Sequence, residues 1–280
     1  MILGGTVTGF YSNVHEWEQI LLRSEFKAIT APFNCNTDKN QISSYLNVLS
    51  KHHVQIAEIG VWKNVLDPNP AVASEAVDFA KKQLALAERL RIPCCVNIAG
   101  TPGSSGWDAA DPQNFTPETY DRTVSVIREI IDSVLPAYSF YCLEPMPWMI
   151  PDGPDEYLQL IKDVDRPQFA VHMDFVNLIN CPRRYLAADS FIEDCFRKLG
   201  PYIKSTHIKD SRMHPTNLTV LLEECSPGEG NLDFVRILRI LDRYLPKNGP
   251  VLLEHMQTEE EYRTSYLFLK RKSAEAGICI

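Results

Sequence analysis

The sequence predicts an α/β fold, a single (β/α)8 barrel domain over residues 1–280, on three observations. Short runs rich in β-branched and aromatic residues alternate eight times with longer stretches of helical spacing. Eight rounds in 280 residues come to about 35 residues each, the size of a barrel unit with short loops. No Gly/Ser linker or low-complexity segment divides the chain. A doubly wound open sheet of this length is the main rival fold.

The first half of the chain supplies four of the eight rounds. We expect strands at Ile2–Gly9, Ala28–Phe33, Val54–Trp62 and Ile92–Gly100. The helices of these rounds are Glu16–Ser24, Lys39–His52, Pro70–Leu90 and Pro117–Leu135, the last preceded by the capping residue Thr116. The third helix is the clearest, because its apolar residues recur at three- and four-residue steps. These residues are Val72, Ala76, Phe79, Ala80, Leu84 and Ala87.

The second half supplies the other four rounds. Its expected strands are Tyr138–Trp148, Phe169–Asn177, Ser205–Met213 and Pro250–Met256. Its expected helices are Asp155–Val164, Phe191–Leu199, Phe234–Leu245 and Glu259–Ser273. Two segments rich in Gly, Pro, Ser and Asn, Gly100–Pro117 and His214–Asn231, each follow a strand. They therefore belong at the carboxyl ends of the strands, where barrel active sites form.

The charge balance excludes several classes of function. The 28 basic and 36 acidic side chains give a net charge of −8, a field that repels nucleic acid and anionic membrane surfaces.

No window approaches 18 consecutive apolar residues, and Met1–Thr6 lacks a basic leader, so we expect a cytoplasmic protein. The eight cysteines form no C-x-x-C pair, and several lie in apolar runs. We therefore expect reduced core cysteines, not a disulfide or zinc framework.

The most informative pattern lies at the ends of the last four expected strands. Each apolar run leads to one side chain that can bind a metal, namely Glu144, Asp174, His207 and Glu254. Their separations of 30, 33 and 47 residues are roughly one round each, the last lengthened by the Gly/Pro-rich segment. Neighbouring strands lie about 4.8 Å apart and alternate residues point inward, so the four side chains can converge. Singly, each would be a helix cap or a satisfied polar residue; together they predict one metal site.

The donor set indicates the metal. Three carboxylates and one imidazole form a hard, oxygen-rich site that suits Mn²⁺, with Mg²⁺ or Co²⁺ as alternatives, better than thiolate-binding zinc. Such a site leaves coordination positions open for substrate oxygens.

These strand ends also resemble those of a known family. Five motifs are similar to those of the xylose-isomerase-like TIM barrels, the sugar and sugar-phosphate isomerase/epimerase superfamily. The motifs are Glu144-Pro145, His172-Met173-Asp174, His207-Ile208-Lys209-Asp210, Pro227-Gly228-Glu229-Gly230 and Leu253-Glu254. The resemblance spans the chain in architecture and is specific in motif only in the second half. It implies that Glu144, Asp174, His207 and Glu254 bind one divalent cation, and that the two glutamates are also acid/base groups.

The chemistry expected from this resemblance follows from the ion. A divalent cation that chelates a carbonyl and the neighbouring hydroxyl acidifies the α-carbon proton and stabilises an enediolate. Glu144 and Glu254 end strands at opposite ends of the ligand set, so we expect them to face opposite sides of a sugar. Two faces permit epimerisation, and one face with a proton shuttle permits aldose–ketose isomerisation. The simpler alternative is that both glutamates only bind the metal.

Weaker signals mark residues around the predicted metal. Trp62, Trp107 and Trp148 lie at or after strand ends and are candidates for an aromatic wall against a sugar ring. Glu58 and Asn97 lie on the third and fourth expected strands and are candidates to hydrogen-bond sugar hydroxyls. His172 is expected one layer below Asp174, where it would either hydrogen-bond a ligand carboxylate or pack in the core. The turn Pro227–Gly230 is a candidate phosphate site, because its backbone N–H groups suit an anion.

A basic cluster follows the sixth and seventh expected strands in this acidic chain. Arg183, Arg184, Lys209 and Arg212 are candidates to grip a carboxylate or phosphate on the sugar, or else form a solvated loop paired with acidic neighbours. Two positions depart from the ketose 3-epimerase branch of the family. That branch has a histidine three residues after the metal aspartate, where this chain has Asn177, also a candidate substrate residue. Its substrate arginine is not matched at the same spacing, since Arg212 lies five residues after His207.

Three alternatives to an isomerase or epimerase stay open. A lyase that cleaves a 3-keto-glycoside by β-elimination would share the first step. An endonuclease IV-like phosphodiesterase would need extra histidines on strands where this chain has Glu58, Trp62 and Asn97. A non-catalytic sugar-binding barrel is disfavoured because all four ligand types are present. The expected partner is a small carbohydrate, not nucleic acid or membrane, and a homo-oligomer is compatible with the sequence.

Overall fold

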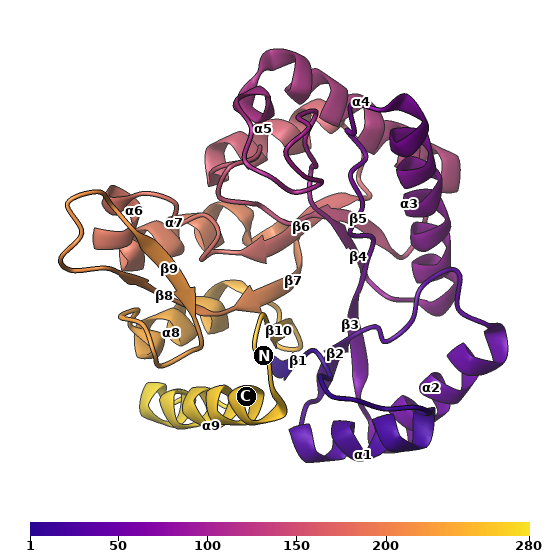
Figure 1. Cartoon of the computed structure of the whole chain (residues 1–280). Helices are drawn as coiled ribbons and strands as arrows, with labels where there is room; N and C mark the ends of the chain where they lie inside the picture. The colour runs from indigo at the N-terminus through magenta and orange to yellow at the C-terminus, as the bar shows by residue number, and fades with distance from the viewer.

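Eight parallel strands close into a barrel in the computed structural model, which describes residues 1–280 (Figure 1). In chain order they are β1 (Ile2–Gly5), β2 (Ala28–Thr30), β3 (Gln55–Gly60), β4 (Cys94–Asn97), β5 (Phe140–Leu143), β6 (Phe169–Asp174), β7 (Ile203–Ile208) and β10 (Pro250–Leu253). The order around the barrel is β1-β10-β7-β6-β5-β4-β3-β2, and β1 pairs with both β10 and β2. The predicted (β/α)8 barrel is therefore confirmed, and the open sheet is excluded.

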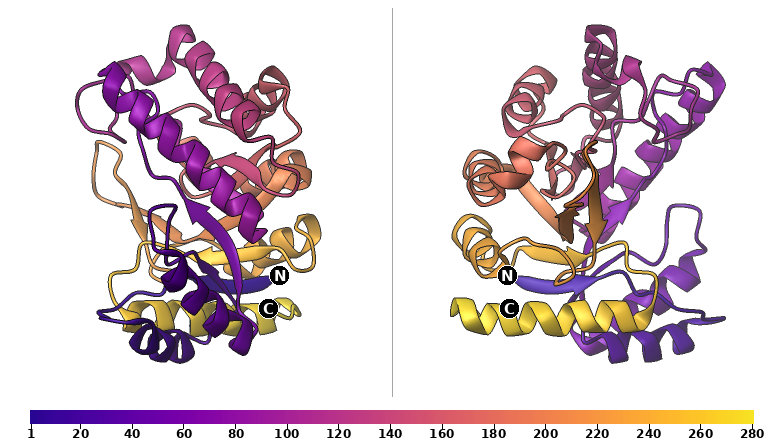
Figure 2. Two further views of the ribbon diagram at one scale, coloured as in Figure 1. Left: turned by 90° about the vertical axis from the view of Figure 1, so that its right-hand side faces the viewer. Right: turned by 60° about the vertical axis from the view of Figure 1, so that its left-hand side comes forward.

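Helices surround this barrel on the outside (Figure 2). They are α1 (Val14–Ser24), α2 (Lys39–His52), α3 (Pro70–Leu90), α4 (Pro117–Val134), α5 (Pro154–Val164), α6 (Pro182–Leu186), α7 (Ala188–Leu199), α8 (Phe234–Tyr244) and α9 (Glu259–Ala276). Two short 3-10 helices, Pro112–Phe115 and Gly200–Tyr202, precede α4 and β7. None of the helices combines the length and apolarity needed to cross a membrane.

Local capping explains where the helices begin. The side chains of Asn69 and Thr116 accept hydrogen bonds from backbone N–H groups in the first turns of α3 and α4, and a proline follows each cap. Thr258 and Glu261 form a reciprocal capping box at the start of α9. These signals place the predicted helix starts close to the observed ones.

The buried face of α3 is turned slightly about the helix axis from the face predicted from sequence. Ala76, Ala80, Leu84 and Ala87 are buried as expected, but Val72 is 44% exposed. The buried stripe begins instead at Ala73 and continues through Val77, at the helical period.

One element was not predicted. It is the antiparallel hairpin of β8 (Asp210–Met213) and β9 (Leu222–Cys225). The predicted strand Ser205–Met213 merges the second half of β7 with β8, and β9 lies inside the segment expected to be a loop. Most of the barrel strands also end earlier than predicted, and the residues beyond them turn into loops at the carboxyl end. Figure 1 shows β8 and β9 at this end, projecting from the barrel beside α6 and α7.

Candidate metal centre

Four adjacent barrel strands each bring one potential ligand to a single point. Asp174 is the last residue of β6, His207 lies near the end of β7, and Glu144 and Glu254 directly follow β5 and β10. One donor atom from each of the four side chains lies within 4.8 Å of every other. Because β5, β6, β7 and β10 are consecutive around the barrel, the convergence follows from the topology.

The imidazole of His207 lies between the two glutamates. Its Nδ1 is 3.0 Å from Oε2 of Glu254 and 3.3 Å from Oε1 of Glu144. Oδ1 of Asp174 accepts hydrogen bonds from the N–H groups of Val176 and Asn177 at the start of the following loop. The other aspartate oxygen, Oδ2, is buried, and its one charged partner is Nζ of Lys209 at 2.8 Å. A buried acceptor of this kind, among two carboxylates and an imidazole nitrogen, fits the donor set of a divalent cation.

One permanent cation, Lys209, lies beside these acids. Its side chain is fully buried, and Nζ lies 2.8 Å from Oδ2 of Asp174, 3.2 Å from Oε2 of Glu254 and 2.7 Å from Oε2 of Glu224. Burial opposes the charge, but these carboxylates raise the pKa of Lys209 well above its usual value. The lysine is thus held as part of the acidic centre and is not free to bind a substrate.

The acids of the centre outnumber its permanent cation. Burial raises the pKa of Asp174 to about 6; Lys209 opposes this rise, and the negative charges of Glu144 and Glu254 add to it. Burial disfavours a charge on His207, yet Glu254, Glu58 and Glu144 raise the pKa of its imidazole well above the usual value. A divalent cation would supply the positive charge that this proton supplies, because histidine binds metals as the neutral ring.

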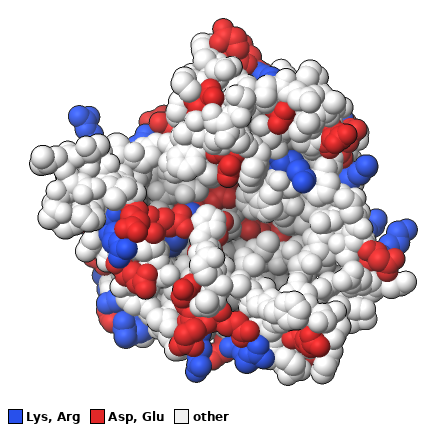
Figure 3. Space-filling model, in the orientation of Figure 1, with Lys and Arg blue, Asp and Glu red and all other residues white.

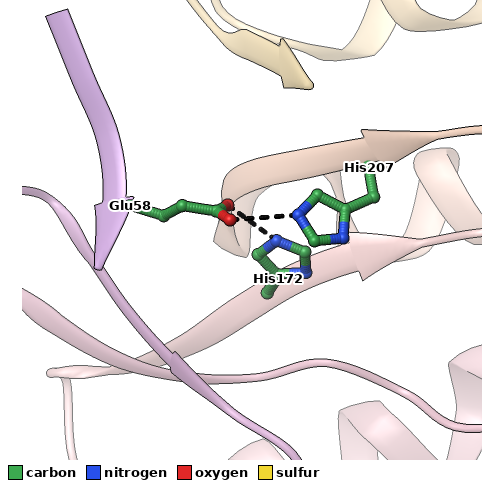
Figure 4. Close-up of side chains that lie close together, drawn as sticks. All are labelled: Glu58, His172 and His207. Atoms are coloured by element: carbon green, nitrogen blue, oxygen red, sulfur yellow. Dashed lines mark hydrogen bonds and ion pairs between the residues drawn. The ribbon is translucent and has the colours of Figure 1, made fainter. Parts of the chain in front are cut away.

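A second cluster lies directly below the first. Glu58 from β3 reaches His172 on β6 and His207 on β7, with hydrogen bonds of 2.8 Å to Nε2 of His172 and 3.0 Å to Nε2 of His207 (Figure 4). His172 is fully buried two residues before Asp174 on β6, and its hydrogen-bond partner Glu58 is not one of the four potential ligands. Burial alone would raise the pKa of Glu58, but the imidazoles of His207 and His172 outweigh it and hold that pKa well below its usual value.

A cavity of about 990 Å³ opens above the potential ligands. Figure 3 shows the hollow at the centre of this face, with acidic side chains inside it. The predicted residues that line it are Glu58, Trp62, Trp107, Glu144, Trp148, Asn177, His207 and Glu254. Nε1 of Trp148 donates to the backbone carbonyl of Asp108, which ties two cavity loops together. Nδ2 of Asn177 donates to Oε1 of Glu144 at 3.3 Å, so this residue contacts a potential ligand.

Four predicted substrate residues do not line the cavity. The side chain of Asn97 bonds to the backbone N–H and carbonyl of Lys63, which turns it away. Arg183 is exposed on α6, and Arg212 is exposed on the hairpin, paired with Glu223 at 2.8 Å. Lys209 is enclosed in its ion pairs.

Two further expectations of anion binding are corrected by the structure. The guanidinium of Arg184 is engaged by the Asp152 and Leu178 carbonyls and by the side chain of Asn180. The turn Pro227–Gly230 directs the N–H groups of Gly228 and Gly230 to Oδ2 of Asp210, at 3.1 and 3.0 Å. These donors are already satisfied, so the turn offers no site for a phosphate.

Several cavity residues were not predicted. Glu224 on β9 bridges Lys209 and His255, with 2.7 Å to Nζ of the lysine and 2.7 Å to Nδ1 of the histidine. His255 holds a left-handed backbone, with φ of 63°, immediately after Glu254. Non-glycine residues in this conformation are uncommon outside helix ends, turns and functional sites, and His255 ends no helix.

Comparison with known proteins identifies relatives of this architecture. A family model described as "Xylose isomerase-like TIM barrel" matches residues 21–272. Comparison of the sequence with curated proteins gives no match.

Solved structures with a similar fold include a xylose isomerase-like TIM barrel protein from Mycobacterium smegmatis in complex with magnesium. Its TM-score is 0.69 at 18% identity, over 95% of this chain and 90% of that chain. A D-psicose 3-epimerase determined in the presence of D-fructose has a TM-score of 0.72 at 16% identity, over 97% and 99%. A probable 3-DHS dehydratase from Bacillus anthracis has a TM-score of 0.73 at 16% identity, over 96% and 99%. At these identities the likeness establishes the fold.

Proposed function

Because the chain belongs to the xylose isomerase-like TIM barrel family, we propose that it is a divalent-metal-dependent sugar isomerase or epimerase. One observation carries the proposal: Glu144, Asp174, His207 and Glu254 converge from four adjacent strands, with donor atoms within 4.8 Å of one another. Manganese is the metal that we expect, with magnesium or cobalt as alternatives, because most of the donors are carboxylate oxygens.

In the proposed reaction, the metal ion and the side chains have separate roles. A divalent cation bound here would polarise a substrate carbonyl and stabilise the negative charge left when the α-carbon loses its proton. Proton transfer falls to Glu144 and Glu254, which stand at the two ends of the four-strand set. Oε2 of Glu144 has no hydrogen-bond partner in the protein, because Asn177 and His207 both contact Oε1 of this glutamate. Oε1 of Glu254 lies 3.3 Å from Nε2 of His255, which is exposed and offers the proton a route to solvent.

The lining of the cavity supports a neutral substrate. Six acidic side chains line it, and no lysine or arginine does. The acidic residues are Glu58, Asp108, Glu144, Glu223, Glu224 and Glu254. A phosphate or carboxylate on the sugar would meet these like charges with no lysine or arginine beside it, and contacts between like charges cost several kcal/mol. The three tryptophans give an apolar wall against which a neutral ring packs.

We therefore expect the Mn²⁺-loaded protein to prefer neutral ketoses or keto-glycosides over their phosphates. The preference in kcat/KM should be at least about tenfold, since about 1.4 kcal/mol of repulsion already gives that factor. Product analysis by NMR with matched neutral and phosphorylated sugars measures it. Arg183→Met is the control, because this arginine is exposed outside the cavity and its loss should leave KM unchanged. A clear preference for the phosphorylated sugars would contradict this choice of substrate.

A lyase acting on a 3-keto-glycoside is the second candidate. One structure of similar fold is a dehydratase, and removal of the same α-proton would begin a β-elimination. The products separate the two reactions: an epimer or isomer retains every atom, whereas elimination frees the substituent and leaves an unsaturated sugar. The endonuclease IV-like alternative has less support, because His207 and His255 are the only histidines that line the cavity.

A further inference from the structure

Glu58 holds four hydrogen-bond donors in the interior of the barrel, although its side chain is not one of the four potential ligands. Its Oε1 accepts from Nε2 of His207 at 3.0 Å and from the hydroxyl of Thr30 at 3.2 Å. Its Oε2 accepts from Nε2 of His172 at 2.8 Å and from the hydroxyl of Ser205 at 2.6 Å. The residue is 1% exposed, so water does not compete for these bonds.

The number of donors determines the ionisation state of this carboxyl group. An ionised carboxylate has about four lone-pair sites and no donor, so it can accept all four of these bonds. A protonated carboxyl group would direct its own O–H at one of the donors and leave a buried group unsatisfied. The network is complete only when Glu58 is ionised and each histidine presents Nε2–H to it.

This arrangement determines which nitrogen of His207 faces the candidate metal centre. With the proton on Nε2, the lone pair of the neutral ring is on Nδ1, the atom 3.0 Å from Glu254 and 3.3 Å from Glu144. We propose that Glu58 is a positioning residue that holds His207 in the Nε2–H tautomer, so that Nδ1 is available to a divalent cation. The inference rests on the proposed function and adds to it a residue that touches neither the metal nor the substrate carbon.

His172 supports the same orientation from the side. Its ring meets the ring of His207 edge to face, with centroids 4.1 Å apart and planes at 79°. Rotation of the His207 ring would break both this contact and the bond to Glu58. Figure 4 shows Glu58 approaching from β3 with both imidazoles at its carboxylate.

Glu58, His172 and His207 also have the composition of a second metal site, but their contacts argue against one. A second cation would need Nε2 of His207 while Nδ1 serves the first, which requires the ring to lose both protons. It would also have to displace the hydroxyls of Thr30 and Ser205 from the carboxylate. The contacts would suit a carboxylate, an imidazole and one bound cation in series, so we expect one cation per chain.

Manganese binding measured by electron paramagnetic resonance tests the proposal without turnover. We expect Glu58→Gln to weaken Mn²⁺ affinity about 10- to 100-fold, the usual effect of losing a partner that orients a ligand. Ser205→Ala is the matched control, because it removes one donor from the same carboxylate and leaves the His207 bond intact. Its affinity should stay within about threefold of the wild type.

Histidine-selective ¹⁵N NMR of the Mg²⁺-loaded protein separates positioning from loss of a nearby negative charge. We expect protonated Nε2 and unprotonated Nδ1 for His207 in the wild type, and a mixed or inverted tautomer in Glu58→Gln. Loss of charge alone would weaken affinity without changing the tautomer. If the variant does not fold, the wild-type spectrum suffices, because a proton on Nδ1 of His207 overturns the proposal. Binding of two cations per chain, or unchanged Mn²⁺ affinity in Glu58→Gln, overturns it as well.

The same experiments distinguish failure of this inference from failure of the proposed function. If the wild type binds no divalent cation, or Asp174→Ala binds it equally well, the metal site itself is refuted. If the wild type binds one cation through Asp174 and the tautomer does not depend on Glu58, only the role of Glu58 is refuted.

Discussion

Glu144→Gln and Glu254→Gln should each lower turnover by about 10²-fold or more, the usual size of a general acid–base contribution. The amide keeps the shape of the side chain and one oxygen for the metal, but it cannot accept the proton. Steady-state kinetics at saturating Mn²⁺, with metal content measured in the same samples, tests this. Glu223→Gln is the matched control, because this glutamate lines the cavity but pairs with Arg212 on the hairpin; its turnover should stay near the wild-type rate.

The two glutamate variants should also differ from each other. In an epimerase with two bases, one variant should still exchange the substrate α-proton with D₂O from one face without forming the epimer. The far-side proton delivery would then be the step that is lost. A single-base isomerase or a lyase would show one glutamate dominating exchange and the other affecting mainly metal affinity. If both variants kept near-full turnover with metal bound, the glutamates would be ligands only, and the proton-transfer mechanism would be wrong.

Loss of a metal ligand is the second large effect that we expect. Asp174→Ala or His207→Ala should weaken Mn²⁺ affinity by at least about 10²-fold, more than loss of a residue that only orients a ligand. Chelation should abolish turnover of the wild type, and added Mn²⁺ should restore it. Asp108→Asn is the control, since this acid lines the cavity away from the four ligands and should leave affinity unchanged. Full activity after complete chelation would contradict a metal-dependent reaction.

The barrel and the convergence of the four strand-end residues could be predicted from sequence because both depend on local signals. Pro70–Leu90 and Lys39–His52 have the predicted bounds, since capping residues and the αL positions at Arg91 and His53 define their ends. Glu144, Asp174, His207 and Glu254 follow apolar runs, and parallel neighbouring strands bring such positions together.

The role of Glu58 could not be predicted, because it depends on partners distant in sequence. Glu58 is bound by residues 28 to 149 positions away, so its sequence neighbourhood gives no sign of its hydrogen bonds. The pairing of two basic residues also depends on the fold: Lys209 pairs with Glu254, 45 residues on, and Arg212 pairs with Glu223 across a hairpin that was not predicted. The strand β9 was not predicted, because its adjacent charged residues Glu223 and Glu224 interrupt the alternation of apolar and polar residues that indicates a strand.

Deuterium incorporation tests the central claim most directly. The wild-type protein is incubated in D₂O with neutral ketoses and keto-glycosides, with Mn²⁺ and again after chelation, and the sugars are followed by proton NMR. The proposed function predicts that deuterium enters at the carbon next to the carbonyl of the true substrate, and that chelation stops the exchange. Deuterium exchange that persists at the same rate without metal, or conversion of a sugar with no incorporation at that carbon, would contradict it.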